Sequence, residues 1–345
     1  MKPRIAAMGA MAVGLALCLF FAGLGIAQPL SPRIAFQIVT GSTGGTYFPA
    51  GELIAGLISH PSGAQRCDKS NTCGPAGLIA TARTSEGTAA NVAAVNNGAA
   101  TSGLAQSDVV AEAVAGKGPF RKAGPATHLR VIAVLFPEDV HLVVATSAKI
   151  AGVSGLKNKR VALGAANSGN LVTARAILSA YGIRERNLKA SFDAPDIAAQ
   201  KMERKELDAF FFVGGTPVPL VQSLIQRGIA KLEPIDGPGR ARLLKAVPAL
   251  AADTIPANTY PGLGKIETVK SRAVWIVNDR QPQSLIYEIT RALFDPGNAQ
   301  ALQANQSTGR INIDNAARDL PAPLHPGAEK FYRERGKLAA GKPSP

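Results

Sequence analysis

The pattern of hydrophobic and polar positions predicts repeated strand–turn–helix units along the chain. An apolar strand at 34–39 leads into a glycine-rich turn at 40–46. After this turn, apolar residues recur at helical spacing, namely Leu53, Ile54, Leu57 and Ile58. The stretch 77–98 repeats the order with Thr88 as the expected helix cap, and a short buried strand follows at 101–108. Units of this kind indicate an α/β fold.

A second block has the same order. Its first strand is followed by the turn 164–170 and by a helix that Gly182 is expected to end. A continuous apolar strand at 209–213 then runs into Gly214-Gly215-Thr216, which is typical of a central strand buried on both faces. Strands at 129–136 and 140–146, joined by Pro137-Glu138-Asp139, are expected to connect the two blocks.

Two blocks of this kind predict two lobes joined by a hinge. Each lobe would present its turns at the carboxyl ends of its strands, where open α/β sheets bind ligands, and the facing edges would form a cleft. We expect the first lobe to comprise 28–142 with 256–335, the second lobe 143–255, and a flexible tail 336–345.

The first residues are predicted to be a signal peptide, 1–27. Lys2 and Arg4 precede a long run of apolar and small residues, and small residues lead up to a cleavage site near Ala27. The alternative is a membrane anchor, because the run is long enough to span a bilayer. Leu17 before Cys18 argues against a lipid anchor, and we expect a periplasmic protein.

Two cysteines remain after cleavage, Cys67 and Cys73, on either side of a short polar loop. In an oxidising compartment a disulfide is the natural interpretation. A metal site is the alternative, but no histidine lies close in the sequence to complete a set of ligands.

The net charge of +14 raises the possibility of a nucleic-acid-binding protein. The basic residues are dispersed and aromatic residues make up only 5% of the chain. Together with export, this argues against nucleic acid and favours a basic surface that attracts anionic solutes.

The sequence contains no recognisable catalytic motif. None of the four histidines stands in a zinc-protease motif, and neither a serine-hydrolase elbow nor a phosphate-binding loop occurs. Glu86 and Asp108 lie near the predicted cleft and could form an acid/base pair, but Ser107 or Asp108 more often caps a helix at such a position. We therefore expect no enzyme, no cofactor and no metal.

The turns instead offer hydroxyls, amides and close backbone approach. The start of a helix exposes N–H groups that suit an anion. Any single hydroxyl here could be an ordinary helix cap, and Tyr47 could be either a core tyrosine or a residue that closes over a ligand.

Several stretches resemble the solute-binding proteins of TRAP transporters, specifically those of the TAXI type. They are "GSTGGTYFPAG", "AAVNNGAATSGLAQSDV", "GLKNKRVALGAANSGNLVTARAILSAYGI", "LDAFFFVGGTPVPLVQSL" and "IPANTYPG". They follow the family's order over nearly the whole chain after the signal. In one departure, "ARTSEGTAAN" stands where many members have a Gly-Gly-Ser turn, so Arg83 and Glu86 could alter the preferred ligand charge.

The resemblance implies a two-lobed periplasmic-binding-protein fold of the type II-like, Venus flytrap kind. It also implies a monomeric receptor that delivers a small carboxylate, such as glutamate, a dicarboxylate or a 2-oxo acid, to TRAP membrane permease subunits. The alternatives are a sensing subunit for a membrane kinase and an exported enzyme on the same scaffold. The expected ligand-binding residues are Ser42, Thr43, Gly44, Gly45, Tyr47, Thr88, Gln106, Ser107, Asp108, Ser168, Gly169, Asn170, Gly214, Gly215, Thr216, Thr259 and Tyr260.

Overall fold

The computed structural model describes residues 33–70 and 72–338. The predicted signal peptide, 1–27, lies outside the described residues, and so does most of the predicted tail, 336–345.

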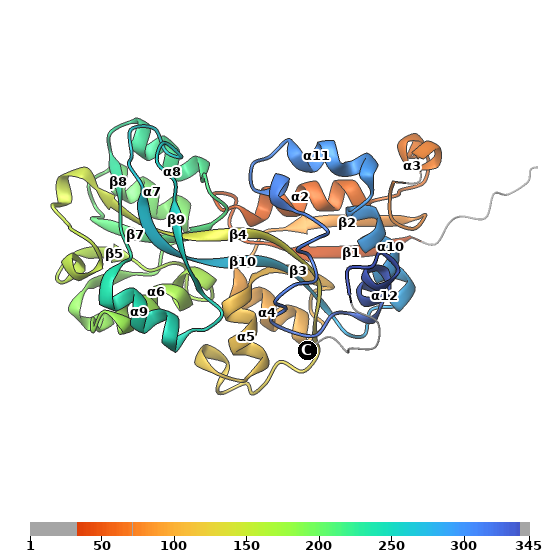
Figure 1. The fold of residues 1–345 in the computed structure, drawn as a ribbon, viewed down its shortest axis with the longest axis horizontal. Coiled ribbons are helices and arrows are strands. Elements are labelled where there is room, and N and C mark those ends of the chain that lie inside the picture. Colours follow the sequence, from red (N-terminus) through yellow and green to blue (C-terminus); the bar gives the residue numbers. More distant parts are fainter. Residues whose placement is uncertain (1–32, 71, 339–345) are drawn as a thin grey trace, which may run out of the picture. The chain divides into compact units, whose positions relative to one another are not determined.

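A ten-stranded mixed sheet organises the described chain (Figure 1). Its path runs β2-β1-β3-β10-β4-β7-β5-β6, while β8 pairs with β4 and β9 pairs with β10. Strands β1, β2 and β3 pair in parallel, as do β5, β6 and β7, and the long β4 and β10 pair antiparallel between the two groups. The strands are β1 (Ile34–Val39), β2 (Leu78–Arg83), β3 (Ser102–Gln106), β4 (Leu129–Ala145), β5 (Arg160–Ala162), β6 (Lys189–Ser191), β7 (Ala209–Gly214), β8 (Ala230–Glu233), β9 (Ala251–Ile255) and β10 (Ile266–Asn278).

Helices cover both faces of the two parallel groups, so the α/β class predicted from the sequence is confirmed. The helices are α2 (Tyr47–Ile58), α3 (Gln65–Ser70), α4 (Thr88–Asn96), α5 (Ser107–Val114), α6 (Gly169–Ala180), α7 (Pro195–Glu203), α8 (Pro219–Gln226), α9 (Gly237–Ala246), α10 (Gln283–Leu293), α11 (Ala299–Gln303) and α12 (Pro326–Glu334).

Three hydrophobic cores divide the described chain into two lobes. The first core takes its residues from 36–136 and 273–332, and we call this part the first lobe. The other two cores take theirs from 140–269, which we call the second lobe. The cores change over within β4 and β10, so these paired strands connect the lobes. The predicted lobe boundaries at 142 and 256 stay predictions.

Strand β7 shows how the sequence builds the second lobe. Side chains alternate between the faces of a strand. Accordingly Phe211 and Val213 pack into the core under α6 and α9, while Phe210 and Phe212 pack into the core under α7 and α8. Every residue of β7 is buried, as the continuous apolar run predicted.

The prediction of two strands joined at Pro137 is wrong, because β4 is one strand of 17 residues. Proline lacks the N–H that a sheet ladder requires, and within sheets it is confined to edges and irregular positions. Pro137 lies opposite Arg272, where the pairing of β4 with β10 shifts register. This irregularity lets the strand pass through the proline.

The predicted disulfide is present, and it joins Cys67 to Cys73 beside α3. No helix among residues 33–70 and 72–338 is long and apolar enough to cross a membrane.

Candidate functional site

A cavity of about 230 Å³ lies at the carboxyl ends of the parallel strands, between the two lobes. The first lobe contributes the turns after β1 and β2 and the end of β3. The second lobe contributes the turns after β5 and β6 and part of β7. The lining residues are Gly41, Ser42, Gly45, Thr46, Tyr47, Ser85, Glu86, Gly87, Thr88, Gln106, Ala165, Ser168, Gly169, Asn170, Ala194, Pro195, Phe212 and Val213.

The first turns or N-caps of five helices, α2, α4, α5, α6 and α7, contribute to this lining. The first N–H groups of an α-helix have no acceptor within the helix, and its N-terminus carries a partial positive charge. Glu86 is the only charged residue among the lining residues that the structure describes, and no Lys or Arg is among them. Attraction for an anion would therefore come from backbone groups.

The structure brings about half of the predicted binding residues into this cavity. Those that line it are Ser42, Gly45, Tyr47, Thr88, Gln106, Ser168, Gly169 and Asn170. Thr43 and Gly44 line a neighbouring cavity of about 590 Å³, which shares Gly45 and Thr46 with the first. The predicted residues that line neither cavity are Ser107, Asp108, Gly214, Gly215, Thr216, Thr259 and Tyr260.

Two expected helix caps are wrong. Thr88 is the first residue of α4 rather than its cap, and its hydroxyl accepts a hydrogen bond from the backbone N–H of Gln106 at 3.2 Å. The N-cap of α5 is Gln106 rather than Ser107 or Asp108. Both Thr88 and Asp108 therefore make tertiary contacts instead of capping their own helices.

Sequence reasoning missed one wall of the cavity, formed by Ala194, Pro195 and Phe212. Pro195 is the first residue of α7, and three residues separate it from the end of the short strand β6. The signal in the sequence is a proline at the first position of a helix that follows a strand. Phe212 belongs to the buried strand β7, and its sequence carries no sign that it borders a cavity.

The two lobes touch on both sides of the cavity. At its exposed side the Asn167 side-chain amide donates to Glu86 at 2.5 Å, and the backbone carbonyl of Asn167 accepts from the N–H of Ala90 at 3.0 Å. Below it, Gln106 donates to Thr173 at 3.3 Å. A Cβ atom at Gly169 would overlap the Gln106 side chain, so only glycine allows this approach.

Buried carboxyl groups lie next to the cavity, although they do not line it. Tyr47 donates to Oε2 of Glu138 at 2.7 Å, and Oε1 of Glu138 has no hydrogen-bond partner among the described residues. Asp108 accepts from Ser271 at 2.6 Å and from Thr173 at 3.2 Å. Burial raises the pKa of Glu138 well above its usual range, and the negative charges of Asp108 and Asp139 add to this rise. We call Tyr47, Asp108 and Glu138 the buried acid cluster.

Burial affects the Asp108 carboxyl group in the same direction as that of Glu138. Burial raises its pKa, although the hydrogen bonds from Ser271 and Thr173 act in the opposite direction. Because Asp108 is enclosed below the cavity and Glu86 is exposed at its edge, these two carboxyl groups do not face a common space as an acid/base pair would.

Tyr260 has a structural role in the second lobe. Its hydroxyl donates to Nε2 of His141 at 2.8 Å and accepts from the Val218 backbone at 2.9 Å. Nδ1 of His141 donates to the carbonyl of Asp139 at 3.0 Å, and burial lowers the histidine pKa to about 4. A neutral His141 thus fixes Tyr260 inside the core.

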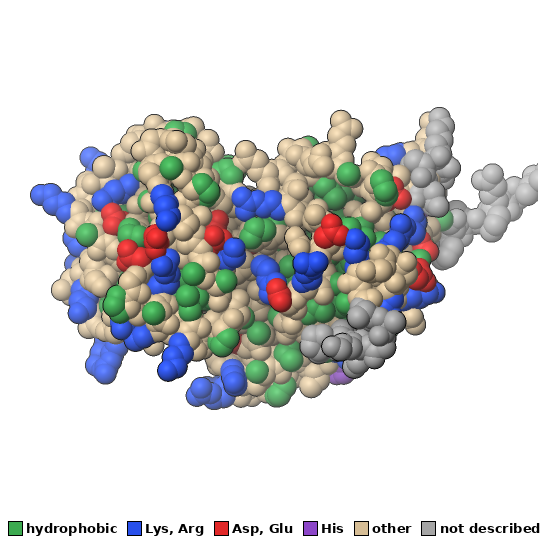
Figure 2. Space-filling view, in the orientation of Figure 1, with side chains coloured by type: hydrophobic (Ala, Val, Ile, Leu, Met, Phe, Trp, Pro, Cys, Tyr) green, Lys and Arg blue, Asp and Glu red, His purple; other side chains and the backbone are tan. Residues whose placement is uncertain are grey.

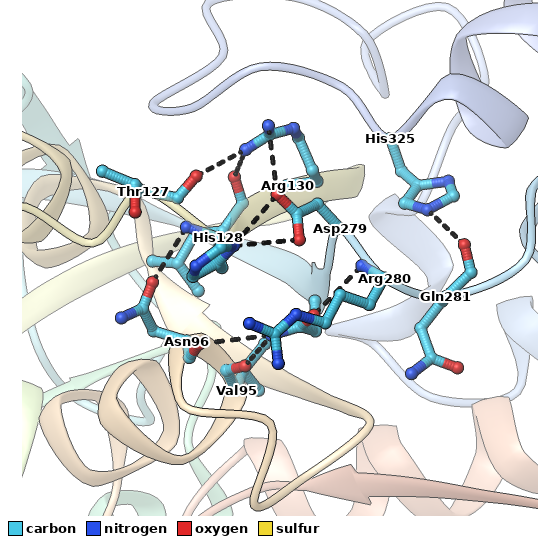
Figure 3. Close-up of polar contacts among 11 residues, drawn as sticks. Val95, Asn96, Thr127, His128, Arg130, Asp279, Arg280, Gln281 and His325 are labelled. Atoms are coloured by element: carbon cyan, nitrogen blue, oxygen red, sulfur yellow. Dashed lines mark hydrogen bonds and ion pairs between the residues drawn. The ribbon is translucent and has the colours of Figure 1, made fainter.

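A second polar cluster lies at the start of β4 and is shown in Figure 3. His128 and Arg130 approach the carboxylate of Asp279 at 3.1 Å and 3.3 Å. Nearby, Nε2 of His325 donates to the carbonyl of Gln281 at 3.0 Å, and burial lowers the pKa of this histidine. We call Asp279, His128 and Arg130 the ion-pair cluster. Both the His128 ring and the Arg130 guanidinium point toward the acid, which is partly exposed.

Basic side chains are spread over the face seen in Figure 2 and do not gather into a single patch there. This agrees with the dispersed basic residues of the sequence. Among the residues that the structure describes, no group of three or more His, Cys, Asp or Glu side chains could hold a metal ion.

Comparison with known proteins places the chain in a family. A family model described as the NMT1-like family matches residues 38–336. Solved structures with a similar fold include MatC from Rhodopseudomonas palustris with bound malate, at 14% identity and a TM-score of 0.49, with 89% of this chain and 98% of that chain covered. Another is the alkanesulfonate-binding protein SsuA from Xanthomonas axonopodis pv. citri bound to MOPS, at 14% identity and a TM-score of 0.43, with 88% and 85% covered.

A third is the periplasmic aliphatic sulphonate binding protein SsuA from Escherichia coli, at 13% identity and a TM-score of 0.42, with 90% and 95% covered. The family match extends from β1 to the end of α12 and so includes every turn that lines the cavity. The chain belongs to the NMT1-like family.

Proposed function

We propose that this protein is a periplasmic receptor that encloses one small carboxylate between its lobes and delivers it to a membrane permease. The single observation that carries the proposal is the cavity of about 230 Å³ into which five helix N-termini converge. At the density of liquid water, a space of this volume would hold about eight water molecules, which suits a small organic acid.

The chemistry of the lining supports an organic anion held by neutral groups. Each helix N-terminus favours a nearby negative charge by about 0.3 to 1 kcal/mol. Hydroxyls of Ser42, Thr88 and Ser168 and the amides of Gln106 and Asn170 add hydrogen-bond donors. Glu86 at the exposed edge would repel a second negative charge held close to it.

The position of the cavity supports capture by closure of the lobes. Lining residues come from both lobes, and hydrogen bonds such as Asn167 to Glu86 link the lobes around it. Within the described part of the chain, the strands that continue from one lobe into the other are β4 and β10, and these would act as the hinge. A ligand drives closure only if it binds the closed state better than the open one, and contacts from both lobes meet this condition.

Delivery to a TRAP-type permease is the finer part of the proposal, and it rests on the resemblance of the turns to TAXI-type receptors. The receptor would act as a monomer, and it would bind and release its solute unchanged.

A thermal-shift screen of the mature protein tests the proposal. The panel contains L-glutamate, 2-oxoglutarate, malate, an amine and a neutral sugar. A ligand that binds only the folded state raises the melting temperature as its concentration exceeds the dissociation constant. We expect a shift with at least one carboxylate. Shifts only with the amine or the sugar would overturn the choice of an anion.

A substitution locates the site. Gly169→Leu places a side chain against Gln106 and Thr88, so we expect affinity for the carboxylate to fall by about tenfold or more. Gly56→Leu is the matched control, because Gly56 is an exposed helical glycine with nothing within 4 Å of a Cβ. Unchanged affinity in Gly169→Leu by calorimetry would place the ligand elsewhere.

A further inference from the structure

Glu138 does not line the cavity, but it holds the hydroxyl of a residue that does. Tyr47 is a lining residue, and its hydroxyl lies 2.7 Å from Oε2 of Glu138. The Thr88 hydroxyl, also from the lining, lies beside the Tyr47 hydroxyl and lowers its pKa, against the larger effects of burial and Glu138 that raise it. The hydroxyl of Tyr47 is therefore at the junction of the cavity and the buried acid.

The direction of the Tyr47–Glu138 hydrogen bond depends on one proton. When Glu138 is ionised it can only accept, so the Tyr47 proton points to Glu138 and the tyrosine offers the cavity only an acceptor. When Glu138 is protonated, its O–H can donate to the Tyr47 oxygen. The Tyr47 O–H is then free to donate to a group in the cavity.

The surroundings of Glu138 favour the protonated form on geometric grounds. Glu138 is 1% exposed, and Oε1 has no partner among the described residues, so ionisation would leave an uncompensated buried charge. The titratable groups that face it are Tyr47 from α2, Asp108 from α5 and its neighbour Asp139 on β4, and none of these is basic.

The basic residues of the adjacent strand are engaged elsewhere. Ser271 of β10 pairs with Glu138 across the sheet and donates to Asp108. On either side of Ser271, Lys270 forms an ion pair with Asp253 and Arg272 forms one with Asp319. No ion pair with a Lys or Arg among residues 33–70 and 72–338 therefore compensates the Glu138 carboxylate.

We propose that Glu138 is a specificity-determining residue that acts through Tyr47, so that the site binds a carboxylate when Glu138 carries a proton and rejects it when Glu138 is ionised. This inference rests on the proposed carboxylate ligand. Binding would transfer one proton from solvent to Glu138 wherever the empty receptor is ionised, while Tyr47 keeps its own proton and turns it toward the ligand oxygen. No covalent bond is made or broken in the ligand.

Calorimetry on the wild-type protein provides the decisive test. The probes are L-glutamate, 2-oxoglutarate and malate, titrated between about pH 6 and pH 9, where their carboxylates stay ionised. Titrations in buffers of different ionisation enthalpy count the protons taken up. We expect uptake of up to one proton and a dissociation constant that rises by as much as about tenfold per pH unit above the pKa of Glu138.

Three variants assign the proton. Glu138→Gln retains a donor toward Tyr47, so we expect affinity within about threefold of the wild-type value at low pH, no proton uptake and no dependence on pH. Tyr47→Phe should lose about tenfold or more in affinity at low pH and also lose the pH dependence. Glu52→Gln is the control, because Glu52 is an exposed glutamate on α2, and it should keep the wild-type proton uptake and pH dependence.

The outcomes separate this inference from the proposed function. If a carboxylate binds the wild-type protein with no proton uptake, or if Glu138→Gln keeps the wild-type pH dependence, the role of Glu138 is overturned and the receptor stands. If no carboxylate binds at any pH while a neutral or cationic solute does, the proposed function fails and this inference fails with it. Binding of a carboxylate to the wild-type protein without proton uptake overturns the role of Glu138 even if a variant does not fold.

Discussion

Two regions along the connecting strands β4 and β10 surround their carboxyl groups in opposite ways. In the ion-pair cluster, Asp279 is partly exposed and is approached by the Arg130 guanidinium and by the His128 ring (Figure 3). In the buried acid cluster, Glu138 is enclosed, is hydrogen-bonded to the neutral hydroxyl of Tyr47 and lies close to a second acid, Asp108. The β4–β10 pair thus has a compensated carboxylate at one end, at Asp279, and an uncompensated acid near its middle, at Glu138, beside the cavity.

This difference separates structural from functional polar groups. A compensated and solvated ion pair stabilises a fold slightly and is screened by salt. A buried acid without a cation is costly, and such groups with shifted pKa values gather at functional sites. The second type marks the region beside the cavity between the lobes, although the acid itself is hidden from that cavity.

The pH dependence of stability tests this contrast most strongly. The pKa of Glu138 is raised in the folded protein, so its contribution to the free energy of unfolding is fully present below the carboxyl pKa of the unfolded chain and is lost as pH rises. Above about pH 6.5, where the lowered pKa values of His141 and His325 no longer affect the slope, we expect wild-type stability to fall, and Glu138→Gln to reduce the slope by up to about 1.4 kcal/mol per pH unit. Urea denaturation at several pH values measures both slopes.

Glu52→Gln serves as the control for this slope, because Glu52 is an exposed glutamate on α2. It should leave the wild-type pH profile unchanged. Asp108 and Asp139 also have raised pKa values through burial, so a residual slope of the same sign should persist in Glu138→Gln. Identical slopes in the wild-type protein and Glu138→Gln would show that Glu138 titrates normally.

A pair of tyrosine substitutions gives the next largest contrast. Tyr47 and Tyr287 both donate to a glutamate, at 2.7 Å in the buried acid cluster and at 2.6 Å between Tyr287 and Glu334 on the surface. Tyr47→Phe leaves both oxygens of a buried carboxyl without a donor, so we expect a loss of about 2 kcal/mol in the free energy of unfolding at neutral pH.

Tyr287→Phe should cost less than about 0.5 kcal/mol, since water replaces the lost hydroxyl at Glu334. Denaturant unfolding of both variants measures the difference. Equal losses for the two tyrosines would mean that burial of Glu138 adds nothing to its hydrogen bond.

The turns that line the cavity could be predicted because their residue types are local signals. Glycines and hydroxyl residues directly after apolar strands, such as Ser42 and Ser168, mark turns at the ligand-binding edge of a sheet, and the structure places both in the cavity. The apolar run of β7 likewise predicted a strand buried on both faces. These features depend on neighbouring residues, which a sequence displays.

The buried acid cluster could not be predicted because it depends on pairing between distant strands. Pro137 suggested a break, so Glu138 appeared to lie in an exposed connection rather than inside β4. Its partner Tyr47 is 91 residues away in the sequence. Only the pairing of β4 with β10, and the packing of α2 and α5 against it, encloses the carboxyl group.

The smallest predicted effect belongs to the ion-pair cluster and depends on salt. Asp279→Asn removes the negative charge that both His128 and Arg130 approach. We therefore expect a loss of about 0.5 to 1 kcal/mol in the free energy of unfolding in dilute buffer. In about 1 M salt the Debye length falls to about 3 Å, and the loss should shrink because the group is partly exposed.

Asp319→Asn is the control, since Asp319 is 80% exposed beside Arg272 and should have little effect at either salt concentration. Tyr47→Phe should show no such salt dependence, because its partner is enclosed. If salt left the Asp279→Asn loss unchanged, the two clusters would not differ in solvation, and burial could not explain the properties of Glu138.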